Sequence, residues 1–165
     1  MENLFECRVR YEKIDEQSGQ EKKVSETYLV DAVNHGEAEA RMYKEMESMI
    51  RGEFQVTNVR KVNYTEVFNK TEGDRWYKSK VTFASIDEKS GKDKKVSNQI
   101  LVTASDVKEA YDNIIKGMGG MTVDFEINGI TESPILDFFQ YFNQEEETPA
   151  NLKPMADVKS QAYKD

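Results

Sequence analysis

The stretch IDEQSGQEKKVS, residues 14–25, returns almost unchanged as IDEKSGKDKKVS at residues 86–97. Residues 14–32 and 86–104 share twelve of nineteen amino acids at a constant offset of 72. The match also extends outward, with Val9 opposite Val81 and Arg8 opposite Lys80. Self-similarity at a fixed spacing indicates that the chain is an internal duplication.

Each copy begins with apolar residues that alternate with polar ones, the pattern of a half-buried strand. In the first copy the apolar positions are Phe5, Cys7, Val9 and Tyr11, and in the second they are Tyr77, Val81 and Phe83. Apolar residues also alternate after each repeated stretch, up to Ala32 and Ala104. Because each repeated stretch contains Ser-Gly, we expect it to form the turn of a hairpin between two strands.

A helix is predicted next, because apolar residues recur at spacings of three and four. They are Ala38, Met42, Met46 and Met49 in one copy and Ala110, Ile114 and Met118 in the other. Asn34 with Glu37, and Asp106 with Glu109, have the spacing of a capping box at the helix start. Gly52 and Gly119-Gly120 are predicted helix stops. A third strand follows in each copy, and then a short aromatic segment, YTEVF or SPILDFF.

These elements predict an α+β fold, a tandem duplication of a ββαβ unit that forms a pseudo-two-fold antiparallel or mixed sheet with helices on one face. We expect the first repeat at residues 1–68, a linker at 69–75, the second repeat at 76–142 and a disordered acidic tail at 143–165. One repeat alone would bury little surface, so we expect the two to pack as a pseudo-dimer.

Composition limits the classes of function. The chain has 165 residues and a net charge of -8, which argues against a wholly basic nucleic-acid binder but allows a basic face. No apolar run approaches the roughly 20 residues of a membrane helix, and the N-terminus carries charges where a signal peptide would be apolar. We therefore expect a cytoplasmic protein.

Residues that could support catalysis or metal binding are few. His35 is the only histidine and stands opposite Val107, so we expect a structural role. Cys7 is the only cysteine, and we expect a small buried hydrophobe. Asp15-Glu16 recurs as Asp87-Glu88, but too few oxygen ligands accompany each pair for a cation site. We therefore expect no enzyme, no cofactor and no metal.

The basic residues of the strands carry the main functional expectation. A sheet with helices on one face and cations on the other can bind a sugar-phosphate backbone. By strand alternation Trp76, Leu29 and Leu101 would point out from that same face, and Trp76 could stack on a base. The predicted contacts for single-stranded nucleic acid are Arg8, Arg10, Lys23, Lys78, Lys80, Lys95 and Trp76.

Other interpretations of the same residues stay open. Strand lysines also discourage edge pairing and favour solubility, and Trp76 could instead close the seam between the two units. The face could equally bind a protein partner. Residues 145–165 hold five acidic residues and three lysines, a composition that partly matches the acidic tails through which single-stranded DNA-binding proteins recruit partners. A plain disordered tail is the favoured interpretation.

Five motifs follow one another along the chain: LFECRVRYEK (4–13), YLVDAVNHGEAEAR (28–41), RGEFQVTNVRKVNY (51–64), GDRWYKSKV (73–81) and ITESPILDFF (130–139). In this order they resemble an uncharacterised family, domain of unknown function 4494 (DUF4494). The resemblance implies no catalytic residues, and it implies a phage or mobile-element setting in bacteria. The leading expectation is thus a non-enzymatic phage or mobile-element protein that binds single-stranded DNA as a replication or recombination accessory. The alternative is a protein-binding adaptor or an inhibitor of a host defence system.

Overall fold

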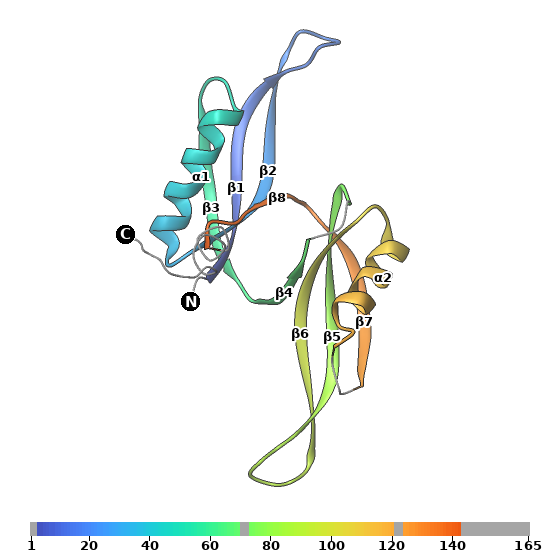
Figure 1. Cartoon of the computed structure of the whole chain (residues 1–165). Helices are drawn as coiled ribbons and strands as arrows, with labels where there is room; N and C mark the ends of the chain where they lie inside the picture. The colour runs from blue at the N-terminus through green and yellow to red at the C-terminus, as the bar shows by residue number, and fades with distance from the viewer. Residues whose placement is uncertain (1–2, 70–72, 121–123, 143–165) are drawn as a thin grey trace, which may run out of the picture. The chain divides into compact units, whose positions relative to one another are not determined.

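The computed structural model describes residues 3–69, 73–120 and 124–142. Two copies of one element order follow each other in these residues (Figure 1). The first copy comprises β1 (Asn3–Ile14), β2 (Glu21–Ala32), α1 (His35–Met49), β3 (Phe54–Val62) and β4 (Tyr64–Phe68). The second comprises β5 (Arg75–Ile86), β6 (Asp93–Ala104), α2 (Val107–Gly117), β7 (Phe125–Ser133) and β8 (Ile135–Phe139). The predicted duplication and the α+β class are confirmed.

The strands form two four-stranded sheets, in the orders β3-β1-β2-β8 and β4-β6-β5-β7. Within each sheet the first two strands of a repeat form the predicted antiparallel hairpin, and the third strand of that repeat pairs antiparallel with the first. The fourth strand comes from the other repeat, because β8 lies beside β2 and β4 pairs in parallel with β6. The last strands of the two repeats are therefore exchanged.

This exchange separates the compact units from the sequence repeats. Of the described residues, one unit comprises 3–62 with 137–142, and the other comprises 63–69, 73–120 and 124–136. Residues 64–68, placed in the first repeat by the sequence, belong to the second unit, and residues 137–142 belong to the first. The physical reason is the connection between strands. Only Asn63 joins β3 to β4 and only Pro134 joins β7 to β8, whereas a chain needs about two residues to turn back as a hairpin.

The repeated stretch forms the same turn in both units. Gly19 and Gly91 have φ of 70° and 69°, a region that other residues avoid. The Gly19 N–H donates to the Asp15 carbonyl, and the Gly91 N–H donates to the Asp87 carbonyl, both at 2.7 Å. The Asp15 and Asp87 carboxylates accept from the N–H two residues on, at 3.0 Å. The recurrent Asp therefore has a structural role in the turn.

Both helices begin as predicted. Asn34 and Asp106 accept from the N–H of Glu37 and Glu109, and each Glu side chain in turn accepts from the backbone just before its cap. Ala38, Met42 and Met46 pack α1 on the first sheet, and Ala110, Ile114 and Met118 occupy the same place in the second core. The prediction for Met49 is wrong: its side chain is 54% exposed at the end of α1, and Ile50 packs against the core in its place.

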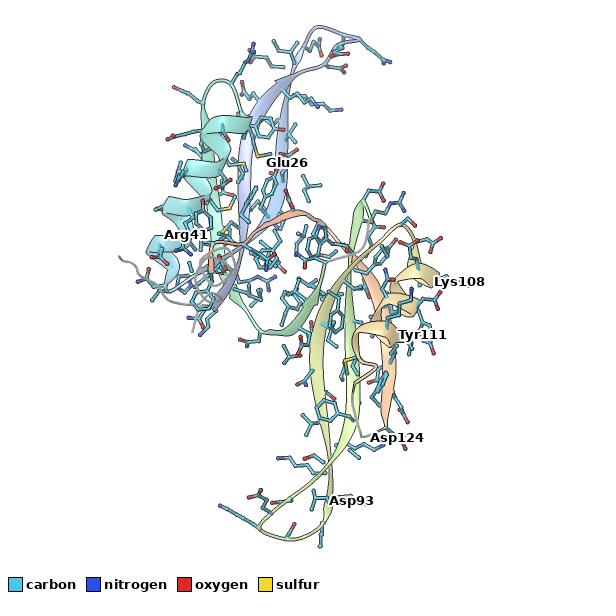
Figure 2. The ribbon with its side chains drawn as sticks, viewed as in Figure 1. Glu26, Arg41, Asp93, Lys108, Tyr111 and Asp124 are labelled. Carbon is cyan, nitrogen blue, oxygen red and sulfur yellow. The ribbon has the colours of Figure 1, made fainter. Side chains whose placement is uncertain are left out.

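Asp31 fixes the chain that follows β8. Its side chain is buried and accepts from the N–H of Tyr141 at 2.8 Å and of Phe142 at 3.0 Å. The Arg41 guanidinium lies 3.6 Å from this carboxylate (Arg41 is labelled in Figure 2). The last strand of the second repeat is thus bound to the first unit by charge as well as by strand pairing.

None of the helices in the described residues is long and apolar enough to cross a membrane.

Candidate nucleic-acid interface

The outer face of the first sheet, opposite α1, carries two rows of polar residues that cross three strands. Arg8 lies between Asn58 on β3 and Thr27 on β2 in the strand register. Arg10 lies between Gln55 and Ser25 in the same way. Both arginines are exposed. Each row therefore combines a guanidinium with amide and hydroxyl groups, the donor types that contact phosphate oxygens.

The outer face of the second sheet repeats part of this arrangement, with lysines in place of arginines. Lys80, at the position that matches Arg8, lies beside Gln99. Lys78, at the position that matches Glu6, lies beside Thr131. Lys95 stands opposite Ala84 near the hairpin, as Lys23 stands opposite Glu12. All four lysines are exposed. The structure thus places six of the seven predicted contact residues, Arg8, Arg10, Lys23, Lys78, Lys80 and Lys95, on outer faces.

A β-bulge keeps these rows in register with the core. The pairing of the third strand shifts between Arg8 and Val9, and it shifts at the matched step between Lys80 and Val81. The extra residues are Thr57 and Asn128. Because each bulge adds one residue, apolar side chains on both sides of it still face the helix.

The charges on the outer faces differ in how they are compensated. Among residues 3–69, 73–120 and 124–142, none of the six cations forms an ion pair, whereas Arg60 is bound to Glu6 at 2.7 Å. At the hairpin, the pKa of Glu21 is raised, chiefly by a hydrogen bond with Glu12. These two acids lower the positive potential around Lys23, so Arg8 and Arg10 form the more basic part of the first face.

The expectation that Trp76, Leu29 and Leu101 are exposed is wrong. Trp76 is 6% exposed, and both leucines are fully buried. Alternation places the three on the outer faces, but Tyr28–Ala32 and Leu101–Ala104 are uninterrupted runs of buried residues, so the strands are covered on both sides there. Strand alternation gives the direction of a side chain and does not tell whether solvent reaches it. A base cannot stack on Trp76 in this arrangement.

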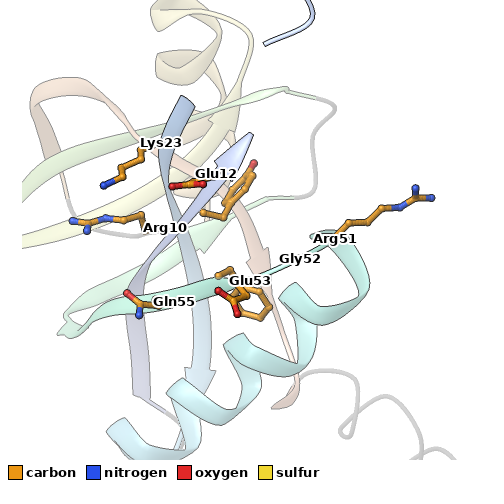
Figure 3. Close-up of a pocket in the computed structure, with 9 residues that line it drawn as sticks. Arg10, Glu12, Lys23, Arg51, Gly52, Glu53 and Gln55 are labelled. Carbon is orange, nitrogen blue, oxygen red and sulfur yellow. The ribbon is translucent and has the colours of Figure 1, made fainter. Parts of the chain in front are cut away.

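A shallow cavity of about 470 Å³ lies at the hairpin end of the first sheet (Figure 3). It is lined by Arg10, Lys23 and Arg51 together with Glu12 and Glu53. In Figure 3 the side chains of Arg10 and Lys23 extend to the same side as Gln55, and Arg51 points away from them. Arg10 and Lys23 are therefore the cations that a ligand in this cavity can meet together.

The matching cavity in the second unit is smaller and acidic. Its volume is about 150 Å³, and its charged lining is Lys95, Asp124 and Glu126. Thr82 replaces Arg10 and Glu126 replaces Gln55. The two outer faces are therefore not equivalent, and the first is the better anion site.

The residues considered for chemistry have structural surroundings. Cys7 is fully buried, as predicted, and burial raises the pKa of its thiol to about 12. The ring of His35 packs edge-on against Phe5 with centroids 4.9 Å apart. No cluster of three or more potential metal ligands occurs in the part of the chain that the structure describes. The acidic tail lies outside the described residues.

The comparison of the chain with protein families agrees with the motifs. Residues 3–141 match the family described as domain of unknown function (DUF4494). The chain belongs to the DUF4494 family. No curated protein matches it at a significant level. The DUF4494 match covers both repeats and the exchanged strands, so the duplicated fold is itself the family domain.

Sequence reasoning missed the neutral partners of the cations in the DUF4494 domain. Asn58, Gln55 and Thr27 become neighbours of Arg8 and Arg10 only through the register of β3 and β2. The hairpin length could have given the β2 register. The β3 register depends on the bulge at Thr57, for which the sequence carries no evident signal.

Proposed function

We propose that this protein binds the backbone of single-stranded DNA through the outer faces of its two sheets, as a non-enzymatic replication or recombination accessory of a phage or mobile element. The observation that carries the proposal is the repeat of exposed, uncompensated cations at matched positions, above all Arg8 and Lys80.

The contacts proposed are with phosphate rather than with bases. On the first outer face Arg8 and Arg10 are the central contacts, and on the second Lys78 and Lys80 are. Lys23 and Lys95 each extend their own face toward its hairpin. Trp76 is left out because it is buried. Backbone contacts of this kind give affinity without sequence preference.

Fluorescence anisotropy with a labelled oligonucleotide across a salt series tests the proposal. If all six cations contact phosphates, the slope of log K against log salt is about -4 for a single strand. The double variant Arg8→Ala, Lys80→Ala removes two contacts and reduces the magnitude of the slope by about 1.4. Lys108→Ala is the matched control, because Lys108 is an exposed cation on α2, away from the outer face (Figure 2).

A gain-of-function variant sharpens the test. Thr82→Arg with Glu126→Gln gives the second outer face the residues of the first, so affinity should rise and the slope should steepen by about 0.7 for the added contact. The proposal is wrong if the protein does not bind at low salt, or if Lys108→Ala weakens binding as much as Arg8→Ala does. An equal response of single- and double-stranded DNA would argue against single-strand preference.

A protein-binding adaptor is the second candidate function, and one observation favours it. Val107, Tyr111 and Ile115 are spaced by four residues on α2 and are 53%, 48% and 39% exposed. Figure 2 shows Tyr111 on this helix. Cross-linking in host lysate, with Tyr111→Lys as the variant, separates this function from DNA binding: loss of a specific adduct would support the adaptor.

A further inference from the structure

The second unit contains a cavity of about 370 Å³ on the helix side of its sheet, away from the cations. Phe68, Phe83, Ile100 and Met118 supply its apolar lining, and Asn98 and Glu66 supply polar groups. The volume is within the range of small-molecule sites, and a mostly apolar lining with a few polar groups is typical of them.

The first unit shows what fills the equivalent space there. Tyr28 holds the position of Ile100, and its ring stacks on Phe139 with centroids 5.5 Å apart and an angle of 26°. Its hydroxyl donates to the Glu26 carboxylate at 3.0 Å (Glu26 is labelled in Figure 2). A phenol ring between an aromatic residue and a polar residue thus completes the first core.

The second unit has an aromatic and a polar residue in the places of these two neighbours and lacks the ring itself. Phe68 is the last residue of β4, as Phe139 is of β8, and Asn98 corresponds to Glu26 at the offset of 72. Ile100 extends less far than tyrosine, and it has no polar group for Asn98 to meet. The duplication therefore leaves an aromatic surface and an amide around an open space.

The end of α2 supports the same geometry. Gly117 lines the cavity, and a Cβ added there would lie 2.6 Å from the ring of Phe68. Glycine at this position therefore lets Phe68 approach the helix, whereas α1 continues to Met49 and carries Glu45 at the matching position. The Glu45 carboxylate accepts from the hydroxyl of Tyr141 in the first unit, so a second phenol closes that core.

We propose that the cavity of the second unit binds a ligand through a phenol ring, stacked on Phe68 with its hydroxyl on the Asn98 amide. The amide can accept from the hydroxyl or donate to it. The Glu66 carboxylate disfavours an anionic group at the same place, so the ligand presents a neutral phenol. The ring comes from a free small phenol or from a tyrosine side chain. This site is independent of the proposed DNA-binding faces.

Titration of the ¹⁵N-labelled full chain with p-cresol, toluene and N-acetyltyrosinamide, followed by NMR, tests the proposal. We expect saturable shifts at Ile100, Asn98 and Met118 with p-cresol, and weaker binding of toluene. Binding of N-acetyltyrosinamide with similar affinity would assign the ring to a tyrosine side chain, and binding of p-cresol alone would assign it to a free phenol.

Two variants and a control keep the test decisive. Ile100→Tyr supplies the ring from the chain itself and should abolish p-cresol binding. Asn98→Leu should lower p-cresol affinity about five- to tenfold and leave toluene unchanged, since it removes one hydrogen bond. Lys95→Ala, on the outer face, should change neither affinity.

The absence of saturable shifts with all three probes would overturn the proposal. So would p-cresol binding that persists in Ile100→Tyr with well-dispersed amide signals. If Ile100→Tyr does not fold, Asn98→Leu decides: an equal loss of toluene and p-cresol affinity would refute the hydroxyl contact.

Discussion

The attachment of β8 to the first unit can be tested at Asp31. This carboxylate is 5% exposed, accepts two backbone N–H groups and lies 3.6 Å from the Arg41 guanidinium. Asp31→Ala leaves the Tyr141 and Phe142 amides without this acceptor. A hydrogen bond to a charged group contributes about 1.5–3 kcal/mol, and loss of one partner of a buried ion pair costs about 3–5 kcal/mol. We expect Asp31→Ala to lower the free energy of unfolding by about 3–5 kcal/mol.

Urea unfolding measures this loss with two probes. Trp76, the only tryptophan, lies in the second unit, while far-UV circular dichroism reports both units. The matched control is Thr103→Val in the second unit, because Thr103 holds the position of Asp31 and its hydroxyl donates to the Phe68 carbonyl at a long 3.4 Å. We expect this control to cost about 1 kcal/mol.

The comparison of the two variants decides the matter. If Asp31→Ala costs no more than Thr103→Val, the chain after β8 does not depend on the buried carboxylate, and the reasoning from charge fails. The loss in free energy of unfolding for Asp31→Asn should lie between the losses for these two variants, since the amide keeps one acceptor oxygen but no charge.

Three further outcomes follow from local geometry. The Cys7 thiol has a pKa of about 12 against an ordinary 9.0, so at pH 8 it should react with iodoacetamide about 1,000-fold more slowly in native than in urea-unfolded protein. Equal rates in the two states would contradict its burial. Gly91→Ala should cost about 1 kcal/mol in thermal unfolding because φ is 69°, whereas Gly120→Ala, with open space and no positive φ, serves as the neutral comparison. Asp106→Ala should cost about 1 kcal/mol through loss of the bond from the Glu109 N–H, and a loss below a few tenths would show that the cap is dispensable.

The sequence was sufficient for every element that depends on local pattern. The hairpins followed from alternation and Ser-Gly, and the helix starts followed from Asn34 and Asp106, because these features involve residues close together in the chain. The exposed cations on the outer faces followed from the same alternation.

Apart from the exposed Met49 at the end of α1, the features that the sequence did not predict depend on distant partners. To predict the exchange of β4 and β8, one must know which sheet edge each strand pairs with. The one-residue connections at Asn63 and Pro134 exclude only a hairpin to the preceding strand. To predict the burial of Trp76, one must know what covers that face of the sheet. To predict the cavity near Ile100, one must know the packed core of the first unit, where Tyr28 occupies the equivalent position.

The two units serve as controls for one another, because they differ at matched positions in each proposed site. On the outer face, Arg10 and Gln55 of the first unit stand where the second has Thr82 and Glu126. On the helix side, Tyr28 of the first unit stands where the second has Ile100. The first unit thus has a buried Tyr28 and a more basic outer face, while the second has a less basic outer face and an open cavity. Since the first difference lies on the outer faces and the second on the helix side, the two sites can be altered separately.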